Sequence, residues 1–133
     1  MRYVVTLDVP DLDAGIRFYG RVFGFAVVAR PVEGYAVLTA GDSQIGLMQR
    51  QEGTRPAKGS PDVRRYARHW TPVHMDFHVP DFAATLARAL HEGAVCEEKF
   101  ESATRPPVAF CSDPFGHGFC LIGERVAPPG PAV

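Results

Sequence analysis

Two segments of the chain place apolar residues at every second position, a pattern typical of strands with one buried face. In residues 3–9 these positions hold Tyr3, Val5, Leu7 and Val9. In residues 73–79 they hold Val73, Met75, Phe77 and Val79. Because side chains on a strand point alternately to its two faces, each segment predicts a half-buried strand.

A helical period follows each predicted strand. The triplet Val9-Pro10-Asp11 ends the first strand, and the same triplet returns as Val79-Pro80-Asp81 at the end of the second. After the first copy, apolar residues recur at Leu12, Ile16, Tyr19 and Phe23. After the second copy, they recur at Phe82, Leu86 and Leu90. The repeated triplet and the repeated change of period indicate one supersecondary unit used twice.

Both predicted helices carry boundary residues. Asp11 and Asp81 stand at the starts, where a carboxylate accepts a bond from a free backbone N–H. Gly24 and Gly93 stand at the ends, where glycine tolerates a left-handed backbone. Three strand-like segments then follow each helix, at 26–31, 34–40 and 43–50, and at 95–101, 107–112 and 117–123. The order predicts an α+β fold class built from two βαβββ modules.

The same patterns predict where the modules end. The first module covers residues 1–50 and the second covers residues 71–125. Between them, residues 51–70 are mostly Gly, Pro, Lys, Arg and other polar residues, which predicts an exposed linker. Residues 126–133, with three prolines and a glycine, predict a flexible tail.

Composition limits the class of partner. The 133 residues are 46% hydrophobic, so the chain is long and apolar enough to bury a core. Its 14 Lys and Arg balance 15 Asp and Glu, which leaves no basic footprint for nucleic acid and no polybasic patch for a membrane. No apolar leader or membrane-length segment is visible, so we expect a cytoplasmic protein that binds small molecules or another protein chain.

Reactive groups are few in this sequence. The three cysteines, Cys96, Cys111 and Cys120, are odd in number and lack metal-ribbon spacing, which favours reduced thiols in the core. Cys120 stands in the apolar run Phe119-Cys120-Leu121-Ile122, and burial there would raise the pKa of its thiol. No glycine-rich phosphate loop or nucleophile elbow is present. The residues therefore specify no nucleophile.

Several short motifs together resemble those of a known family. The first module holds Val9-Pro10-Asp11-Leu12-Asp13, Arg17-Phe18-Tyr19 and Val22-Phe23-Gly24-Phe25, and the second holds Asp113-Pro114-Phe115-Gly116-His117. Their order and spacing resemble the vicinal oxygen chelate superfamily, which contains glyoxalase I, extradiol dioxygenases and bleomycin-resistance proteins. The resemblance implies that each module curls into half of an open cup, and that two facing modules enclose a ligand. In small members the two halves often come from different chains, which implies a homodimer.

The second-module motif also predicts a turn on its own chemistry. Pro114 presets φ at the second position of a tight turn, and Asp113 can bond the backbone ahead of it. Gly116 accepts a positive φ. A plain connection between two strands is therefore a more economical interpretation of Asp113 than a catalytic role.

Metal-dependent members of the family hold an ion with four cup-face ligands, and this chain can be compared at each place. His74 matches, whereas the other three places hold Val4, Gly46 and Cys120. One His and one Cys supply neither the oxygen ligands of Mg²⁺ or Mn²⁺ nor the facial triad of Fe(II). We therefore expect no metal and no cofactor.

A displaced metal site remains an alternative. Asp76 and His78 share a strand face with His74, so the three side chains could form another ligand set. Same-face residues on a strand lie about 6.5–7 Å apart, which makes it difficult for all three to hold one ion.

A cup without a metal can bind a flat or bulky apolar molecule by burial and stacking. The bleomycin-resistance branch is similar in size and sequesters a drug without altering it. We therefore predict a binding protein that captures a hydrophobic or aromatic small molecule, such as an antibiotic or natural product, and confers resistance. The predicted ligand-binding residues are Thr6, Tyr35, Met48, Arg50, Trp70, His74, Asp76, Phe100, Phe110 and Cys120.

The strand patterns leave part of this set open. Tyr35 and Phe110 can face either the core or the cup, whereas Trp70, in a polar segment, is the aromatic residue we most expect to be displayed.

Two other functions also remain possible for this chain. The chain could be a metal-dependent or His-based lyase, isomerase or dioxygenase, with His74 as base and Asp76 as its orienter. It could also be a structural or regulatory module with an empty cup.

Overall fold

The computed structural model describes residues 1–124. The predicted tail over 126–133 lies outside these residues. The first module contains β1 (Val5–Val9), α1 (Leu12–Phe23), β2 (Ala26–Val32), β3 (Tyr35–Ala40) and β4 (Ser43–Gln49). The second contains β5 (Met75–Val79), α2 (Phe82–His91), β6 (Val95–Phe100), β7 (Val108–Ser112) and β8 (Gly118–Gly123). The predicted α+β class and the doubled βαβββ order are confirmed.

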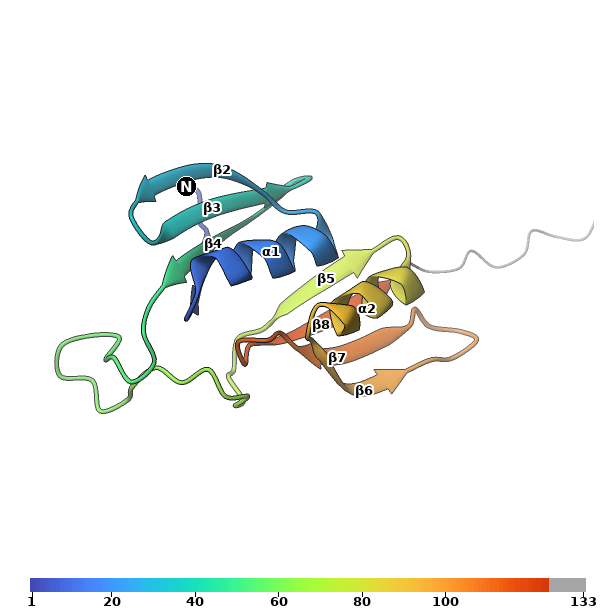
Figure 1. Cartoon of the computed structure of the whole chain (residues 1–133). Coiled ribbons are helices and arrows are strands. Elements are labelled where there is room, and N and C mark those ends of the chain that lie inside the picture. Colours follow the sequence, from blue (N-terminus) through green and yellow to red (C-terminus); the bar gives the residue numbers. More distant parts are fainter. Residues whose placement is uncertain (125–133) are drawn as a thin grey trace, which may run out of the picture.

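The two modules have the same topology. The first sheet has the strand order β1-β4-β3-β2, and the second has the equivalent order β5-β8-β7-β6. In each sheet the first strand runs parallel to the last, and the remaining pairs are antiparallel. Figure 1 shows each helix lying across one face of its own sheet. In the described part of the chain, no strand of one sheet is hydrogen-bonded to the other sheet.

The helix boundaries follow the predicted chemistry with one difference. The carboxylates of Asp11 and Asp81 accept bonds from the third residue after each of them, at 3.1 and 3.0 Å. Gly24 ends α1 in the left-handed region, with φ 77°. The second helix ends differently, because Glu92 is the cap and Gly93 turns the chain one residue later with φ 104°.

Some predicted core positions are corrected by the structure. Both first strands begin two residues later than predicted, and Tyr3 and Val73 before them are 79% and 71% exposed. Leu90 was expected in the core but is 45% exposed, whereas Ala89 is fully buried. Leu90 lies beside the buried face of α2, which is formed by Phe82, Thr85, Leu86 and Ala89.

Aromatic packing joins the two modules at α1. The rings of Phe23 and Phe77 stack with their centres 4.0 Å apart and an angle of 17° between their planes. On the same side, the guanidinium of Arg88 in α2 donates to the carbonyl of Val22 at 3.1 Å. Helix α1 therefore contacts its own sheet and the second module at once.

A buried hydrogen bond strengthens this joint. The hydroxyl of Tyr19 donates to Oδ2 of Asp113 at 2.6 Å, and both side chains are buried. Burial, and secondly the neighbouring Asp113 carboxylate, raise the pKa of Tyr19 well above its usual range. Because the phenol stays protonated, it can serve as a donor to the carboxylate at any physiological pH.

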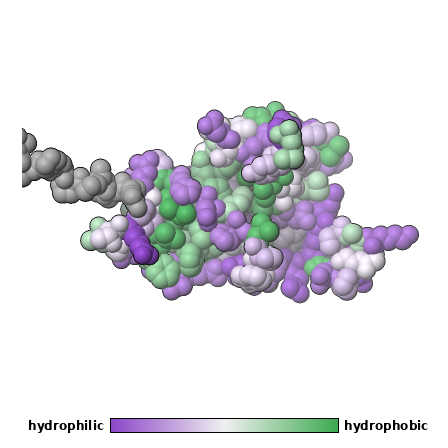
Figure 2. Space-filling model, turned by 180° about the vertical axis from the view of Figure 1, so that it is seen from behind, coloured by the Kyte–Doolittle hydropathy of each residue, from purple (hydrophilic) through white to green (hydrophobic). Residues whose placement is uncertain are grey.

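The surface opposite the helices keeps apolar groups exposed. Figure 2, viewed from behind, shows hydrophobic surface in green between polar regions. Large exposed apolar residues in the described chain include Trp70, Val32, Val95, Phe100 and Phe110. None of the helices in residues 1–124 is long and apolar enough to cross a membrane.

Candidate ligand-binding site

A cavity of about 360 Å³ opens on the second module, beside the end of the linker. Four predicted ligand-binding residues line it: Trp70, His74, Phe110 and Cys120. Its volume lies at the small end of the range for pockets that bind small molecules. All of its lining residues come from the linker and the second module, so the first module contributes none of its wall.

Aromatic side chains form much of the apolar wall. Trp70 is 78% exposed, as its place in a polar segment predicted, and Phe110 is 40% exposed rather than packed in the core. The ring of Phe100 meets Phe110 edge to face, with the ring centres 5.4 Å apart. Phe100 and Phe110 both line a neighbouring hollow, and Phe110 therefore borders both that hollow and the cavity.

Three polar side chains come together beside the cavity; His74 and Cys120 line it, whereas Asp76 does not. Nε2 of His74 lies 3.3 Å from Oδ1 of Asp76, and these two residues and Cys120 offer donor atoms that all lie within 4.8 Å of one another. Burial, and secondly the charge of Asp76, raise the pKa of the Cys120 thiol from 9.0 to about 11. Cys120 is therefore a protonated thiol at neutral pH, as its apolar context predicted.

This cluster differs in its members from the displaced site considered for His74, Asp76 and His78. His74 and Asp76 come together although they are two residues apart, because His74 precedes the start of β5 and is not held in the regular strand geometry. The third donor is Cys120, which is the register partner of Asp76 on the neighbouring strand β8. His78 is not a member of the group.

The first module gathers a different part of the predicted set. Tyr35 is the register partner of Met48, and Thr6 is the register partner of Gly46. A Cβ on Gly46 would lie 2.6 Å from Oγ1 of Thr6 and 2.8 Å from Cε2 of Tyr35. The ring of Tyr35 therefore lies across the bare backbone of Gly46, and this face of the sheet presents a phenol and a threonine hydroxyl.

The geometry at Gly46 tests the family's metal centre. A ligand from this place would need a side chain, but Thr6 and Tyr35 already occupy the space that its Cβ requires. The four-ligand centre shared by two modules therefore does not fit this chain. The three donors of the second module form a separate cluster, which a softer ion such as Zn²⁺ would find acceptable in donor type.

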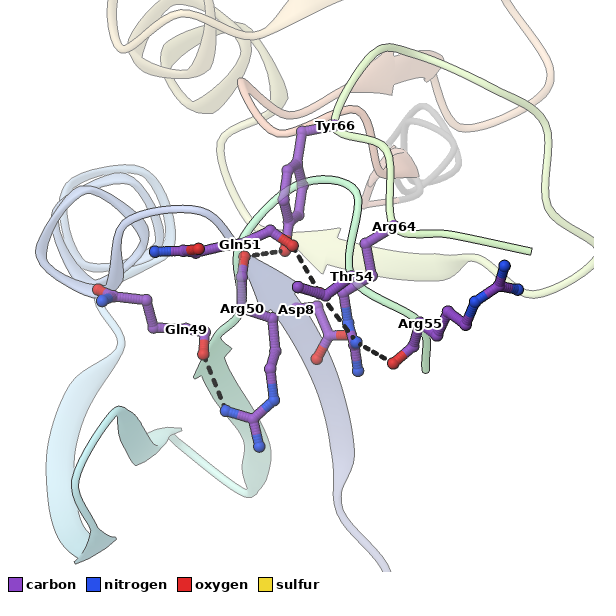
Figure 3. Close-up of polar contacts among 8 residues, drawn as sticks. All are labelled: Asp8, Gln49, Arg50, Gln51, Thr54, Arg55, Arg64 and Tyr66. Carbon is purple, nitrogen blue, oxygen red and sulfur yellow. Dashed lines mark hydrogen bonds and ion pairs between the residues drawn. The ribbon is translucent and has the colours of Figure 1, made fainter. Parts of the chain in front are cut away.

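Arg50 lies at the end of the first module and not in the cavity. Its guanidinium donates to the carbonyl of Gln49 at 2.9 Å, and its own carbonyl accepts from the hydroxyl of Tyr66 at 2.6 Å (Figure 3). In the same region, Nε of Arg64 donates to Oδ2 of Asp8 at 2.7 Å. These contacts fasten the linker to the end of the first sheet.

Three charged residues that line the cavity were not predicted from the sequence: Arg68, Glu97 and Glu98. Nε of Arg68 lies 3.1 Å from Oε1 of Glu97, and both residues line the wall. The guanidinium of Arg68 rests on Gly118, because a Cβ there would lie 2.8 Å from Nη2. A glycine inside the last predicted strand was the available signal, since such a residue often marks a close approach by another group.

The predicted turn before β8 is confirmed and has a second role. Oδ1 of Asp113 accepts from the backbone N–H groups of Phe115 and His117, at 2.9 and 3.0 Å, and Gly116 has φ 89°. Oδ2 lies 2.8 Å from Nδ1 of His117 and also accepts from Tyr19. The same carboxylate thus closes the turn and binds the first module.

Comparison with known proteins agrees with this architecture. A family model described as "Glyoxalase-like domain" matches residues 4–122. No curated protein matches the chain. Solved structures with a similar fold include the fosfomycin resistance protein FosX from Mesorhizobium loti, with 18% identity, a TM-score of 0.68, and 95% of this chain and 93% of that chain covered.

Two other solved structures show how varied the proteins with this fold are. A glyoxalase/bleomycin resistance protein from Albidiferax ferrireducens has 19% identity and a TM-score of 0.65, with 94% of this chain and 99% of that chain covered. A lactoylglutathione lyase from Agrobacterium tumefaciens has 21% identity and a TM-score of 0.61, with 93% of each chain covered. At these identities the likeness establishes the fold and not the activity.

Proposed function

The chain belongs to the glyoxalase-like domain family, and from that premise we propose that it is a metal-free binding protein for a hydrophobic or aromatic small molecule. The ligand would be an antibiotic or another natural product, held without chemical change. Resistance appears in the names of two proteins with a similar fold, which is consistent with a protective role. We further propose that the protein acts in the cytoplasm, because its three described cysteines are free thiols.

The observation that carries this proposal is the composition of the two half cups. The second module offers a small cavity with Trp70 and Phe110 in its wall, and His74 as a polar anchor. The first module offers Tyr35 lying over Gly46, where metal-dependent relatives need a ligand. Aromatic rings on both halves favour stacking and burial of a planar molecule, and they leave too few donors for a shared metal centre.

A homodimer would complete the site. Each sheet has one face covered by its helix, and the first module gives nothing to the cavity of the second. We call the side of the first sheet that carries Tyr35 the Tyr35 face, and the cavity on the second module the Trp70 cavity. We propose that the Tyr35 face of one protomer covers the Trp70 cavity of its partner, which would produce two cups per dimer. Such an arrangement would bury exposed apolar groups, including Phe110 and Trp70.

Capture and turnover can be separated by what is recovered. We expect a panel of aromatic natural products to contain a ligand that quenches or shifts Trp70 fluorescence and saturates at one molecule per cup. After the protein is denatured, mass spectrometry should recover that ligand unchanged and in full. Product formed beyond one equivalent per cup would contradict capture and favour an enzyme.

Single substitutions then test the wall of the cavity. Trp70→Ala and Phe110→Ala should each weaken binding by about 1–3 kcal/mol, because each removes buried area and a ring contact. This loss corresponds to a rise in Kd of about one to two powers of ten. His74→Ala should cost only about 1 kcal/mol, the typical contribution of one hydrogen bond. Exposed Lys58→Ala is the control and should bind normally.

The cluster of His74, Asp76 and Cys120 favours one alternative, an enzyme of the glyoxalase type that uses a soft metal ion or His74 itself as base. Zinc sites need at least three protein ligands, and this cluster offers three. Against it, the raised pKa of Cys120 means that an ion must displace a proton from a buried thiol.

Metal analysis distinguishes the alternative from the proposal. We expect the purified protein to contain well below one equivalent of zinc, and added Zn²⁺ to leave its unfolding temperature unchanged. One equivalent of zinc that is lost in both His74→Ala and Cys120→Ala would overturn the metal-free proposal. If Asp76→Asn retained all of the zinc, Asp76 would not be a ligand. The metal-free proposal would still be overturned.

A further inference from the structure

Two cysteines outside the polar cluster face each other across neighbouring strands. Cys96 on β6 and Cys111 on β7 are direct register partners in an antiparallel pair. Opposite residues in such pairs have Cα atoms about 4.5–5.5 Å apart. A disulfide requires Cα atoms about 4.4–6.8 Å apart, so this pairing meets the backbone requirement without movement of either strand.

The side chains are also positioned for each other. Both thiols lie on the face of the sheet that packs against the core, and Sγ of Cys96 donates to the carbonyl of Glu98 at 3.7 Å. Cys111 is 1% exposed, whereas Cys96 is only partly buried, near the start of the outer strand. The register between Cys96 and Glu98 is interrupted by a bulge, which gives this part of β6 local freedom.

We propose that Cys96 and Cys111 form a reversible redox pair, which a low-molecular-weight disulfide such as glutathione disulfide converts to an intrachain disulfide. The thiolate of Cys96 attacks the small disulfide, forms a mixed disulfide and releases one small thiol. The thiolate of Cys111 then attacks Sγ of Cys96 and releases the second small thiol. The two protein thiols are oxidised, and one small disulfide is reduced to two thiols.

Burial assigns the order of the two steps. Burial, and secondly the neighbouring Cys96, raise the pKa of Cys111 to about 12, so Cys111 is a poor initial nucleophile. Cys96 is the more accessible thiol and is the group that a small disulfide can approach. Once Cys96 carries the mixed disulfide, Cys111 is the nearest thiol that can resolve it within the sheet.

The pair adjoins the ligand cavity. Residue Glu97, next to Cys96, pairs with Arg68 in the cavity wall, and Cys111 itself is part of that wall. The disulfide would tie the outer strand β6 to β7 directly behind the cavity. We therefore expect oxidation to raise the unfolding temperature by several degrees, because a cross-link restricts the unfolded chain.

The test uses the full protein incubated with glutathione disulfide. The intact mass should fall by two hydrogens without a retained glutathione, peptide mapping should join Cys96 to Cys111, and a reducing agent should reverse both changes. Cys111→Ala should instead accumulate glutathione on Cys96, and Cys96→Ser should form no cross-link. Circular dichroism verifies that each variant is folded.

The third cysteine provides the matched control. Cys120 faces Asp76 on the other side of the sheet, so Cys120→Ser should form the Cys96–Cys111 bond as the wild type does. A glutathione adduct that persists on Cys96 in the wild type would overturn the proposal. A bond from Cys111 to Cys120, or no change in mass after complete exposure to the oxidant, would overturn it as well.

Discussion

Asp113 shows how one buried carboxylate connects local and distant structure. Its two oxygens accept from two backbone N–H groups of its own turn, from Nδ1 of His117 and from the hydroxyl of Tyr19 in α1. Its side chain is fully buried. A buried charge is costly unless it is hydrogen-bonded, and these donors supply the hydrogen bonds that the carboxylate needs. The carboxylate therefore holds the two modules in one arrangement.

Removing the Tyr19 hydroxyl tests this connection. Tyr19→Phe should lower the free energy of unfolding by about 1.5–3 kcal/mol, the usual range for a hydrogen bond to a charged group. Urea denaturation provides the measurement. Tyr66→Phe is the control, because its hydroxyl binds a backbone carbonyl at an exposed site. Equal losses in the two variants would show that the Tyr19–Asp113 bond has no special role.

Cys120 should make the free energy of unfolding depend on pH. Its pKa is raised from 9.0 to about 11, so the folded protein holds this proton more tightly than the unfolded chain does. The associated stability is complete below pH 9 and is lost as the pH rises through 11. Unfolding of Cys120→Ala should therefore depend less on pH than that of the wild type between these values. Identical profiles would contradict the shift.

At the scale of elements, β4 decides what the first half cup presents. Gly46 stands in the middle of this strand, and its missing side chain lets the Tyr35 ring of β3 approach the backbone closely. The neighbouring positions, Ile45 and Leu47, point into the core. The side chains of β4 therefore alternate between an inner face that packs in the core and an outer face that Tyr35 covers.

Adding one methyl group at this strand should disturb the arrangement. Gly46→Ala places a Cβ 2.6 Å from Oγ1 of Thr6 and 2.8 Å from Cε2 of Tyr35, so one of them must shift. We expect a loss of stability of about 1–3 kcal/mol, typical of overpacking. Thermal or urea denaturation measures the loss.

A double variant identifies the cause of that loss. Tyr35→Ala removes one of the two close contacts, so Gly46→Ala should cost less in the Tyr35→Ala background than in the wild type, and the contact with Oγ1 of Thr6 accounts for the remaining cost. If the two substitutions were additive, the close approach of Tyr35 would not be the source of the cost.

At the scale of the whole molecule, the joint between the modules leaves both half cups uncovered. The stacked Phe23 and Phe77 and the Tyr19–Asp113 bond hold α1 against the second module. The cavity beside Trp70 and the Tyr35 face belong to different modules, and no first-module residue lines that cavity. In the proposed homodimer, the second chain would supply a wall for each cavity.

Subunit mixing tests the shared cup. Tyr35→Ala and Trp70→Ala homodimers should both bind ligand weakly, because every cup lacks one ring. A heterodimer of the two variants, isolated with two affinity tags, contains one intact cup and one cup without either ring. Ligand titration should therefore recover one tight site per heterodimer.

The same experiment can reject the shared cup. Cups formed within one chain would leave each site of the heterodimer with one defect, so no tight binding would return. A monomer at all concentrations in sedimentation would exclude shared cups directly. The binding proposal would survive that result, but the ligand would then rest on the second module alone.

Local chemistry allowed the sequence alone to predict the elements and their order. The alternating runs at 3–9 and 73–79, the helix caps at Asp11 and Asp81 and the turn at Asp113 depend on neighbours within a few residues. Backbone geometry and side-chain period act over such short ranges, so the doubled βαβββ order was readable. The exposure of Trp70 and the raised pKa of Cys120 were readable for the same reason.

Tertiary structure decided which distant side chains meet. The contact of Cys120 with Asp76 depends on the register of β5 and β8, and the pairing of Cys96 with Cys111 depends on that of β6 and β7. The position of Tyr35 over Gly46 depends on the register of β3 and β4, and the bond from Tyr19 to Asp113 joins residues 94 positions apart in sequence. Strand register and the docking of one element on another arise from the whole core at once, so no local pattern in the sequence could reveal them.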